Sequence, residues 1–320
     1  MIDAGHLSQG EVPPPSLADR PKRSKTTPRA FWRQYVAISP FFILFAAFGI
    51  IPLVYAGWLS FQSWDGIGTP VFVGFDQFAR LINDSQFWQA LGTTLIIFIF
   101  GQVPLVVGAC VGAALLSKLR GRGLFQTLFF LPQVTSLVMV SIVFQSMFST
   151  SYGIVNRALE SLGIPGFDWL ENQWGIKVVL ALMVIWRGFG YFMVVFIAGI
   201  AAIPPELYDA ARVDGAGAVR TFISITLPLL RPTIVFVSVT SIIGGLQLFT
   251  EPQVLFNGTG GPGNAGRTLM LLQYQYLVGG QQTAIRPDIG YASTIGWAIF
   301  AILLVLSVIY GRVLRRSLEA

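Results

Sequence analysis

The chain has 320 residues, of which 54% are hydrophobic and only 11% are charged, and its formal net charge is +6. Soluble domains carry about 25% charged residues, so this composition excludes a soluble globular protein and indicates a membrane protein. A single cysteine, Cys110, and a single histidine, His6, exclude a soft-ligand metal cluster and a Cys/His or Ser/His catalytic pair in the apolar part. No Gly-x-x-x-x-Gly-Lys-Ser/Thr segment occurs, so the chain lacks a phosphate-binding loop of its own.

Residues 1–30 form a polar tail that contains three consecutive prolines and a run of basic residues between Arg20 and Arg29. No apolar period is present, so we expect a disordered, basic, cytoplasmic tail. The apolar run after it is about 25 residues long, which exceeds the core of a signal peptide. We therefore expect residues 31–320 to form one membrane domain that begins with a retained span.

Six apolar stretches follow, each long enough to cross a bilayer as a helix. At about 20 residues per span, they leave little chain for a soluble catalytic domain. The sequence therefore predicts an all-α membrane protein with six transmembrane helices, over residues 36–61, 92–116, 124–148, 176–200, 233–256 and 290–312.

Basic residues are concentrated in alternate connecting segments. Fifteen of the 21 Lys and Arg residues lie in the N-terminal segment, the loops after the second and fourth stretches, and the C-terminal end. The positive-inside rule places these segments in the cytoplasm, with both termini. We interpret the positive charge as a topology signal, expect lipid around the spans, and expect no nucleic-acid partner, because no soluble basic domain is present.

The loop after the fourth stretch is predicted to fold as helix, turn, helix. Pro204-Pro205 followed by Glu206 favours a helix start, and Gly215 suits the left-handed cap that ends it. A second helical segment is expected over about 217–226, before prolines that introduce the fifth stretch. Such a defined cytoplasmic loop is either a docking site for a partner protein or an ordinary solvated connector.

The spacing of this loop resembles a known family. Asp209-Ala210-Ala211, three residues, Gly215, nine residues, then Ile225 and Leu227-Pro228 is similar to the EAA loop of permeases in binding-protein-dependent ABC importers. Asp209 stands where the family usually has Glu. Five further segments resemble the sugar-importing subgroup: Ser39-Pro-Phe-Phe, Gly121-Arg-Gly-Leu-Phe-Gln126 with Phe130-Leu-Pro132, Ile185-Trp-Arg-Gly-Phe-Gly190, Ala198-Gly-Ile-Ala-Ala-Ile-Pro204 and Thr259-Gly-Gly-Pro-Gly-Asn264. The segment that ends at Asn264 is similar to the first of the two permeases in such systems, the maltose-permease-like one.

The resemblance implies a multi-subunit importer in the cell membrane. This chain would pair with a second, homologous permease above two ABC ATPase subunits, and an extracytoplasmic solute-binding protein would deliver the substrate. It would not be an enzyme and would hold no cofactor, since ATP and Mg would be bound by the ATPases. The implied ATPase-coupling residues are Glu206, Tyr208, Asp209, Ala210, Ala211, Asp214, Gly215 and Ala216.

Polar residues inside apolar stretches are costly in a membrane, so they are candidates for the substrate path. Arg187 is the strongest, because Trp186, Gly188 and Tyr191 lie within one helical turn of it, and sugars bind to aromatic faces and hydrogen-bonding groups. These residues also fit helix–helix contacts, and Arg187 also fits a pair with Glu251. The remaining candidates are Gln133, Ser241, Gly244, Gly245, Gln247 and Glu251.

Three other functions stay open at this point. The same machinery would suit a phosphorylated polyol such as glycerol phosphate, because a buried cation favours an anion. A secondary transporter without an ATPase is a second possibility, although its usual internal repeat is not evident. A membrane enzyme is disfavoured, because the apolar stretches contain no His, only the single cysteine Cys110 and no paired acidic residues.

Overall fold

The computed structural model describes residues 28–117, 119, 121–280 and 284–319. The chain divides into two compact units, Met1–Val54 and Tyr55–Ala320, which are considered separately. The predicted tail lies almost wholly outside the described residues, so its disorder and the boundary at residue 30 stay predictions.

The first unit is one apolar helical segment. It contains α1 (Pro28–Phe45), the π-helical turn η2 (Ala46–Ile50) and the start of α2 (Ile51–Leu59). Within the span Tyr35–Leu59, the most apolar 18-residue stretch has no buried side chain in the described structure.

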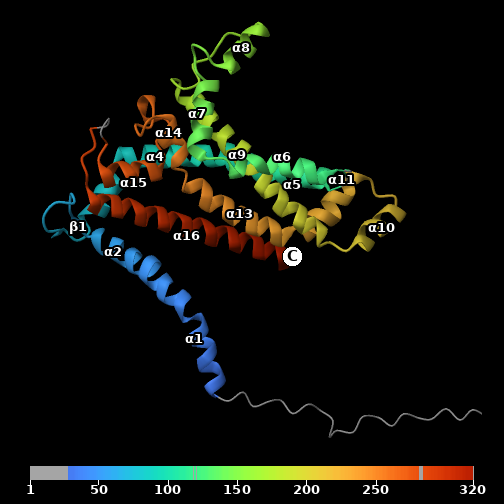
Figure 1. Ribbon diagram of the computed structural model, residues 1–320, viewed down its shortest axis with the longest axis horizontal. Coiled ribbons are helices and arrows are strands. Elements are labelled where there is room, and N and C mark those ends of the chain that lie inside the picture. The colour runs from blue at the N-terminus through green and yellow to red at the C-terminus, as the bar shows by residue number, and fades with distance from the viewer. Residues whose placement is uncertain (1–27, 118, 120, 281–283, 320) are drawn as a thin grey trace, which may run out of the picture. The chain divides into compact units, whose positions relative to one another are not determined.

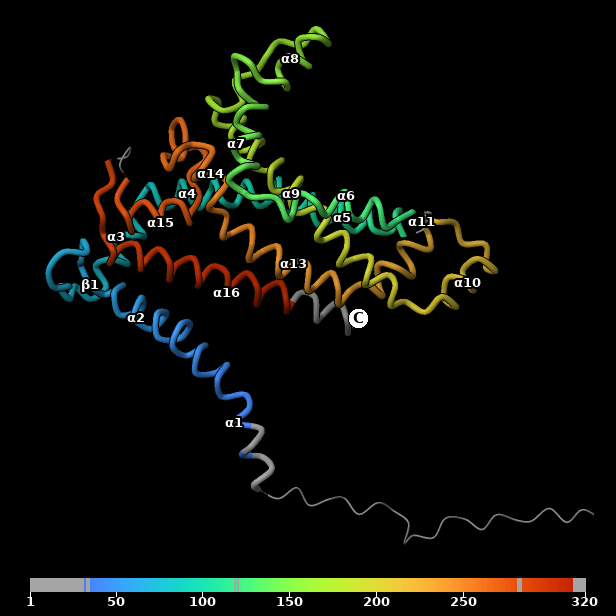
Figure 2. Tube along the Cα trace, in the orientation of Figure 1, coloured from blue at the N-terminus to red at the C-terminus, as the bar shows by residue number. Residues whose placement is uncertain are grey.

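The second unit is a helical bundle in which α9 is central (Figures 1 and 2). Residues Ile176, Met193 and Phe196 of α9 are almost fully buried, and they pack in one apolar cluster with α5 and α13. The helices of this unit are α3 (Asp76–Asn83), α4 (Ser85–Ile97), η3 (Phe98–Gln102), α5 (Val103–Leu116), α6 (Arg122–Val134), α7 (Leu137–Met147), α8 (Ile154–Ser161), α9 (Gln173–Ala201), α10 (Pro205–Val213), α11 (Ala218–Thr221), η4 (Phe222–Thr226), α12 (Leu227–Leu229), α13 (Arg231–Leu246), α14 (Thr250–Leu255), η5 (Pro262–Asn264), α15 (Leu269–Val278) and α16 (Ile289–Glu319).

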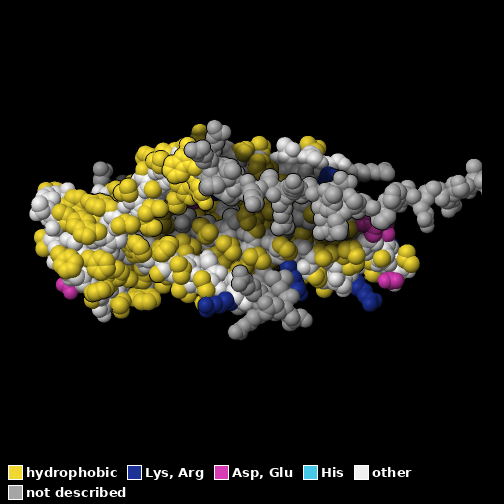
Figure 3. Space-filling view, turned by 90° about the horizontal axis from the view of Figure 1, so that it is seen from below, with side chains coloured by type: hydrophobic (Ala, Val, Ile, Leu, Met, Phe, Trp, Pro, Cys, Tyr) yellow, Lys and Arg dark blue, Asp and Glu magenta, His cyan; other side chains and the backbone are white. Residues whose placement is uncertain are grey.

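Five helical segments are long and apolar enough to cross a membrane: Tyr35–Leu59, Ser85–Leu116, Gln173–Ala201, Arg231–Leu255 and Ile289–Arg312. The total rises to six if α6 and α7 cross together as one broken span. Hydrophobic side chains cover much of the described surface drawn in Figure 3 and charged ones are few on it, as expected of a surface that meets lipid.

The prediction of one helix over the third span, 124–148, is wrong, because the structure has two helices there. Helices α6 and α7 are bent by 94° across a break of two residues, and α7 turns away from the bundle in Figure 1. Thr135 has an extended backbone, with φ −76° and ψ 144°. Pro132, inside the last turn of α6, has no N–H to donate and weakens the helix just before the break.

The two ends of the second unit differ. One end holds α3 and a short antiparallel ribbon of β1 (Gln62–Ser63) and β2 (Val71–Phe72). This ribbon is the one β-sheet in the described residues of a chain that was predicted to be all-α. The other end holds α10 and α11 (Figure 1). The segment with β1, β2 and α3 and the segment with α10 and α11, which the alternation of charge predicts on opposite sides of the membrane, thus lie at opposite ends of this unit.

A charged cluster fastens α3 and the start of α4 to α16. Arg80 Nη1 donates a hydrogen bond to Asp288 Oδ2 at 2.6 Å, and its guanidinium carbon lies 3.9 Å from the ring centroid of Tyr291. The Tyr291 hydroxyl donates to Asp84 Oδ2 at 2.6 Å. Burial lowers the pKa of Arg80, but the hydrogen bond to Asp288 and the charges of Asp288, Tyr276 and Tyr291 together raise it more, so the net pKa is raised.

Candidate functional site: an intramembrane cavity and a helical loop

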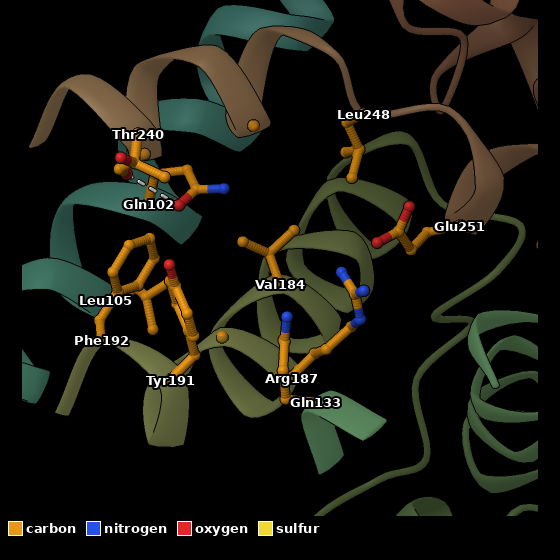
Figure 4. Close-up of a pocket in the computed structure, with 13 residues that line it drawn as sticks. Gln102, Leu105, Gln133, Val184, Arg187, Tyr191, Phe192, Thr240, Leu248 and Glu251 are labelled. Carbon is orange, nitrogen blue, oxygen red and sulfur yellow. Dashed lines mark hydrogen bonds between the residues drawn. The ribbon is translucent and has the colours of Figure 1, made fainter. Parts of the chain in front are cut away.

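A cavity of about 200 Å³ lies inside the second unit, between η3, α5, α6, α9, α13 and α14. Helices far apart in sequence meet here, and Figure 4 shows their side chains arranged around the open space. Polar and apolar groups alternate on its walls: Gln102, Leu105, Gln133, Val184, Arg187, Gly188, Tyr191, Phe192, Thr240, Ser241, Gly244, Leu248 and Glu251.

Arg187 and Glu251 carry opposite charges into this cavity from different helices. Arg187 lies on α9 and Glu251 lies in the first turn of α14, where only 6% of it is exposed. The Arg187 guanidinium points toward the Glu251 carboxylate at one side of the cavity (Figure 4). Within the described residues no ion pair of 4.0 Å or less joins them, and the buried Nε of Arg187 lacks a hydrogen-bond partner. The direct Arg187–Glu251 pair considered from the sequence is therefore not formed.

Gln102 was not among the predicted site residues, although it lines the cavity. Its Oε1 accepts a hydrogen bond of 2.9 Å from the Ser241 hydroxyl, and both residues are buried. Figure 4 shows the amide nitrogen directed into the open space. Gln102 ends the π-helical turn η3, a distortion that is frequent at functional sites. The available sequence signal was the amide itself, which stands inside an apolar stretch.

Seven of the ten predicted path residues line the cavity: Gln133, Arg187, Gly188, Tyr191, Ser241, Gly244 and Glu251. The other three do not. The Trp186 ring packs 5.8 Å from the ring of Phe144, measured between centroids. Gly245 is packed against η3, and Gln247 is exposed at the end of α13. That any of the ten contacts a substrate remains a prediction.

The predicted helical loop has the expected local structure. Helix α10 covers Pro205–Val213, and Gly215 follows it with φ 72°. The amide of Ala216 donates to the Ala211 carbonyl at 2.9 Å, and the amide of Gly215 donates to the Arg212 carbonyl at 3.1 Å. This pair of bonds is the Schellman motif, which ends a helix with a left-handed glycine. The turn is thus held by the backbone of Gly215.

One face of this loop is anchored to the bundle. Ala211 is buried, and the Tyr208 hydroxyl lies 3.2 Å from the hydroxyl of buried Thr226 in η4. Tyr208 also packs against the apolar cluster around α9. The loop is therefore fixed to the bundle by direct side-chain contacts.

The opposite face of the loop is exposed and mixed in character. It carries acidic side chains together with large apolar ones, and Val213 is 88% exposed. Asp209 forms an ion pair with Arg212 on this surface, which contributes little stability because both side chains are exposed. The predicted residues on this face are Glu206, Asp209, Ala210, Asp214 and Gly215, with Ala216 half-buried at its edge.

Comparisons with known proteins give a consistent result. Residues 104–319 match the family described as "Binding-protein-dependent transport system inner membrane component". The lactose transport system permease protein LacF of Rhizobium radiobacter is 38% identical over 293 residues, covering 88% of this chain and 96% of that protein. The arabinooligosaccharide permease AraP of Halalkalibacterium halodurans is 36% identical over 278 residues, covering 86% of this chain and 85% of that protein.

A solved structure has the same fold. It is a chain of a bacterial ABC transporter that imports the acidic polysaccharide alginate, with a TM-score of 0.75 and 24% sequence identity. The match covers 90% of this chain and 96% of the other. At this identity the likeness concerns the fold alone.

Proposed function

The chain belongs to the family of inner-membrane components of binding-protein-dependent transport systems, and from this premise we propose that it is a permease subunit of a sugar-importing ABC transporter. It is a multi-pass membrane protein, as its composition predicted, and its family is one of inner-membrane components. The proposed cargo is a mono- or oligosaccharide, which is supported by the lactose and arabinooligosaccharide permeases among its relatives.

The observation that carries the proposal is the polar cavity within apolar helices. A polar side chain inside a membrane is costly unless it has a partner or a function. Arg187, Gln102 and Glu251 face the cavity together with the aromatic ring of Tyr191. Such a set suits sugar hydroxyls, which both donate and accept hydrogen bonds, and the flatter face of a sugar ring packs on an aromatic ring. We place the translocation path here.

We further propose that α10 is the coupling helix and that its end of the second unit is cytoplasmic. Its exposed face, with acidic groups and Val213, would seat in one of two ABC ATPase subunits. Those subunits bind ATP and Mg, so this chain performs no covalent chemistry. Closure of the ATPases displaces α10, and Ala211 with the Tyr208–Thr226 contact passes the displacement to η4 and α13.

The remaining proposed partners are a second permease and an extracytoplasmic solute-binding protein. The second permease would complete the wall of the path, and the binding protein would deliver the sugar to the end that carries α3. A secondary transporter is not supported, because the family is defined by dependence on a binding protein. Whether the cargo is a phosphorylated polyol instead depends on whether the charged groups in the cavity attract or repel an anion.

The coupling proposal is tested by two substitutions in the assembled importer. In Gly215→Pro, proline cannot adopt φ 72° and has no N–H to donate a hydrogen bond to the Arg212 carbonyl, so the turn is lost. Asp209→Lys reverses an exposed charge and leaves the fold intact. We expect both to reduce ATPase co-purification or sugar uptake at least tenfold, measured in membranes that contain all subunits.

The matched controls lie in the loop between α8 and α9, away from α10. Gly163→Pro places proline at another left-handed glycine, with φ 76°, and Glu171→Lys reverses another exposed acidic residue. Both are expected to keep assembly and uptake. If Asp209→Lys assembles and transports like Glu171→Lys, α10 is not the coupling helix.

A further inference from the structure

We infer that Glu251 makes the cavity selective for uncharged sugars and excludes anionic ones, by opposing the charge of Arg187. This inference rests on the proposed translocation path and names the substrate class that it accepts. Arg187 alone would favour a phosphate or a carboxylate. The relatives leave the class open, since they include a lactose permease and the solved transporter imports an acidic polysaccharide.

The charges on the walls are balanced. Among the described residues that line the cavity, Arg187 and Glu251 are the only ones with a basic or an acidic side chain. They face each other without forming an ion pair, and neither donates to or accepts from another described side chain. The space between them is therefore flanked by a hydrogen-bond donor and an acceptor, from a basic and an acidic side chain.

A hydroxyl group satisfies both walls at once, since it accepts from the Arg187 guanidinium and donates to the Glu251 carboxylate. An anion satisfies Arg187 but places a second negative charge near Glu251. Because the cavity lies among apolar helices, this repulsion is weakly screened. Like charges brought together in this way give discrimination against the wrong ligand.

The uncharged part of the wall fits the same ligand. The Ser241 hydroxyl donates to Gln102 Oε1, which holds the amide so that its nitrogen is presented to the cavity. Gly245 packs against the Gln102 side chain and leaves it little room to turn. A fixed neutral donor recognises hydroxyl oxygens and adds no charge that would attract an anion.

The electrostatic claim is tested with a cysteine reporter in membranes that contain the complete importer. Gly244 lines the cavity and has no atom within 4 Å of an added Cβ, so Gly244→Cys fits there. The only native cysteine, Cys110, is replaced by alanine. The modification rate is measured with anionic, cationic and uncharged methanethiosulfonate reagents, and each charged rate is divided by the uncharged one.

We expect Glu251→Gln to raise the normalised anionic rate by about tenfold and to lower the cationic one, as one unit charge several ångströms away does at intermediate dielectric. Arg187→Gln should shift both rates in the opposite direction. Glu171→Gln, which removes an acidic residue away from the cavity, should change neither. If Glu251→Gln leaves the anionic rate within twofold of the parent, Glu251 does not set the charge of the cavity and the inference is wrong.

Failure of the proposed path gives a different result. Uptake of lactose and arabinotriose is measured before and after modification of Gly244→Cys by the uncharged reagent. Modification is expected to block uptake. If it leaves the uptake of a transported sugar unchanged, the cavity is not on the path, whatever the charge readout shows.

Discussion

Replacing Gly190 by alanine would drive a methyl group into the backbone of α6. A Cβ at this position would lie 1.9 Å from the Phe129 carbonyl oxygen and 2.6 Å from the Phe130 nitrogen. Contacts below 3.0 Å essentially never occur for Cβ atoms, so α6 and α9 must separate by about 1 Å or more. Backbone atoms cannot move aside as a flexible side chain does.

This separation should affect both stability and transport. Overpacking of a well-packed core costs about 1–3 kcal/mol, and we expect the upper end because the clash is with backbone. Helix α6 carries Gln133 and α9 carries Arg187, so the separation also displaces two walls of the cavity relative to each other. The unfolding temperature of the purified chain in detergent should fall by about 5 °C or more, and sugar uptake should fall with it.

Gly92→Ala is the matched control. Gly92 lies within α4, and an added Cβ would have no atom within 4 Å. Because alanine favours a helix over glycine by about 1 kcal/mol, this variant should be as stable as the parent or slightly more so. Equal unfolding temperatures and equal uptake for Gly190→Ala and Gly92→Ala would refute the close backbone packing of α6 on α9.

Two further substitutions test individual contacts. Ser241→Ala frees the Gln102 amide, so we expect the KM for sugar uptake to rise about fivefold, equivalent to one hydrogen bond of about 1 kcal/mol. Ser238→Ala on the same helix should leave KM unchanged, and equal KM values for the two variants would count against the role of Gln102. Tyr291→Phe removes the donor to Asp84 Oδ2 in a buried setting, so the free energy of unfolding should fall by about 2 kcal/mol, and a loss below about 0.5 kcal/mol would mean that this bond does not fasten α4 to α16.

Features that depend only on residues adjacent in sequence were predicted well. Long apolar stretches locate the spans, because in lipid a helix satisfies its own backbone. The α10 loop is a second example, since Pro204-Pro205 and Gly215 determine where a helix begins and ends through their own backbone preferences. Neither result requires knowledge of what packs against the segment.

The break between α6 and α7 shows the limit of such signals. The stretch 124–148 is apolar throughout, and hydropathy does not distinguish one straight helix from two short ones. Pro132 is a visible cause of weakness, but prolines also occur within helices that continue, such as Pro40 in α1. The 94° bend therefore depends on the tertiary environment of the break.

The sequence by itself establishes that this is an apolar helical membrane protein with a structured polar loop, because hydropathy and capping are local properties. It also identifies Arg187 and Glu251 as unusual, because a charge inside an apolar stretch is conspicuous. Whether these two residues, 64 positions apart, form an ion pair or only line the same cavity depends on how α9 and α14 pack. The same packing, with the π-helical turn η3, brings Gln102 to the cavity, and no local pattern encodes it.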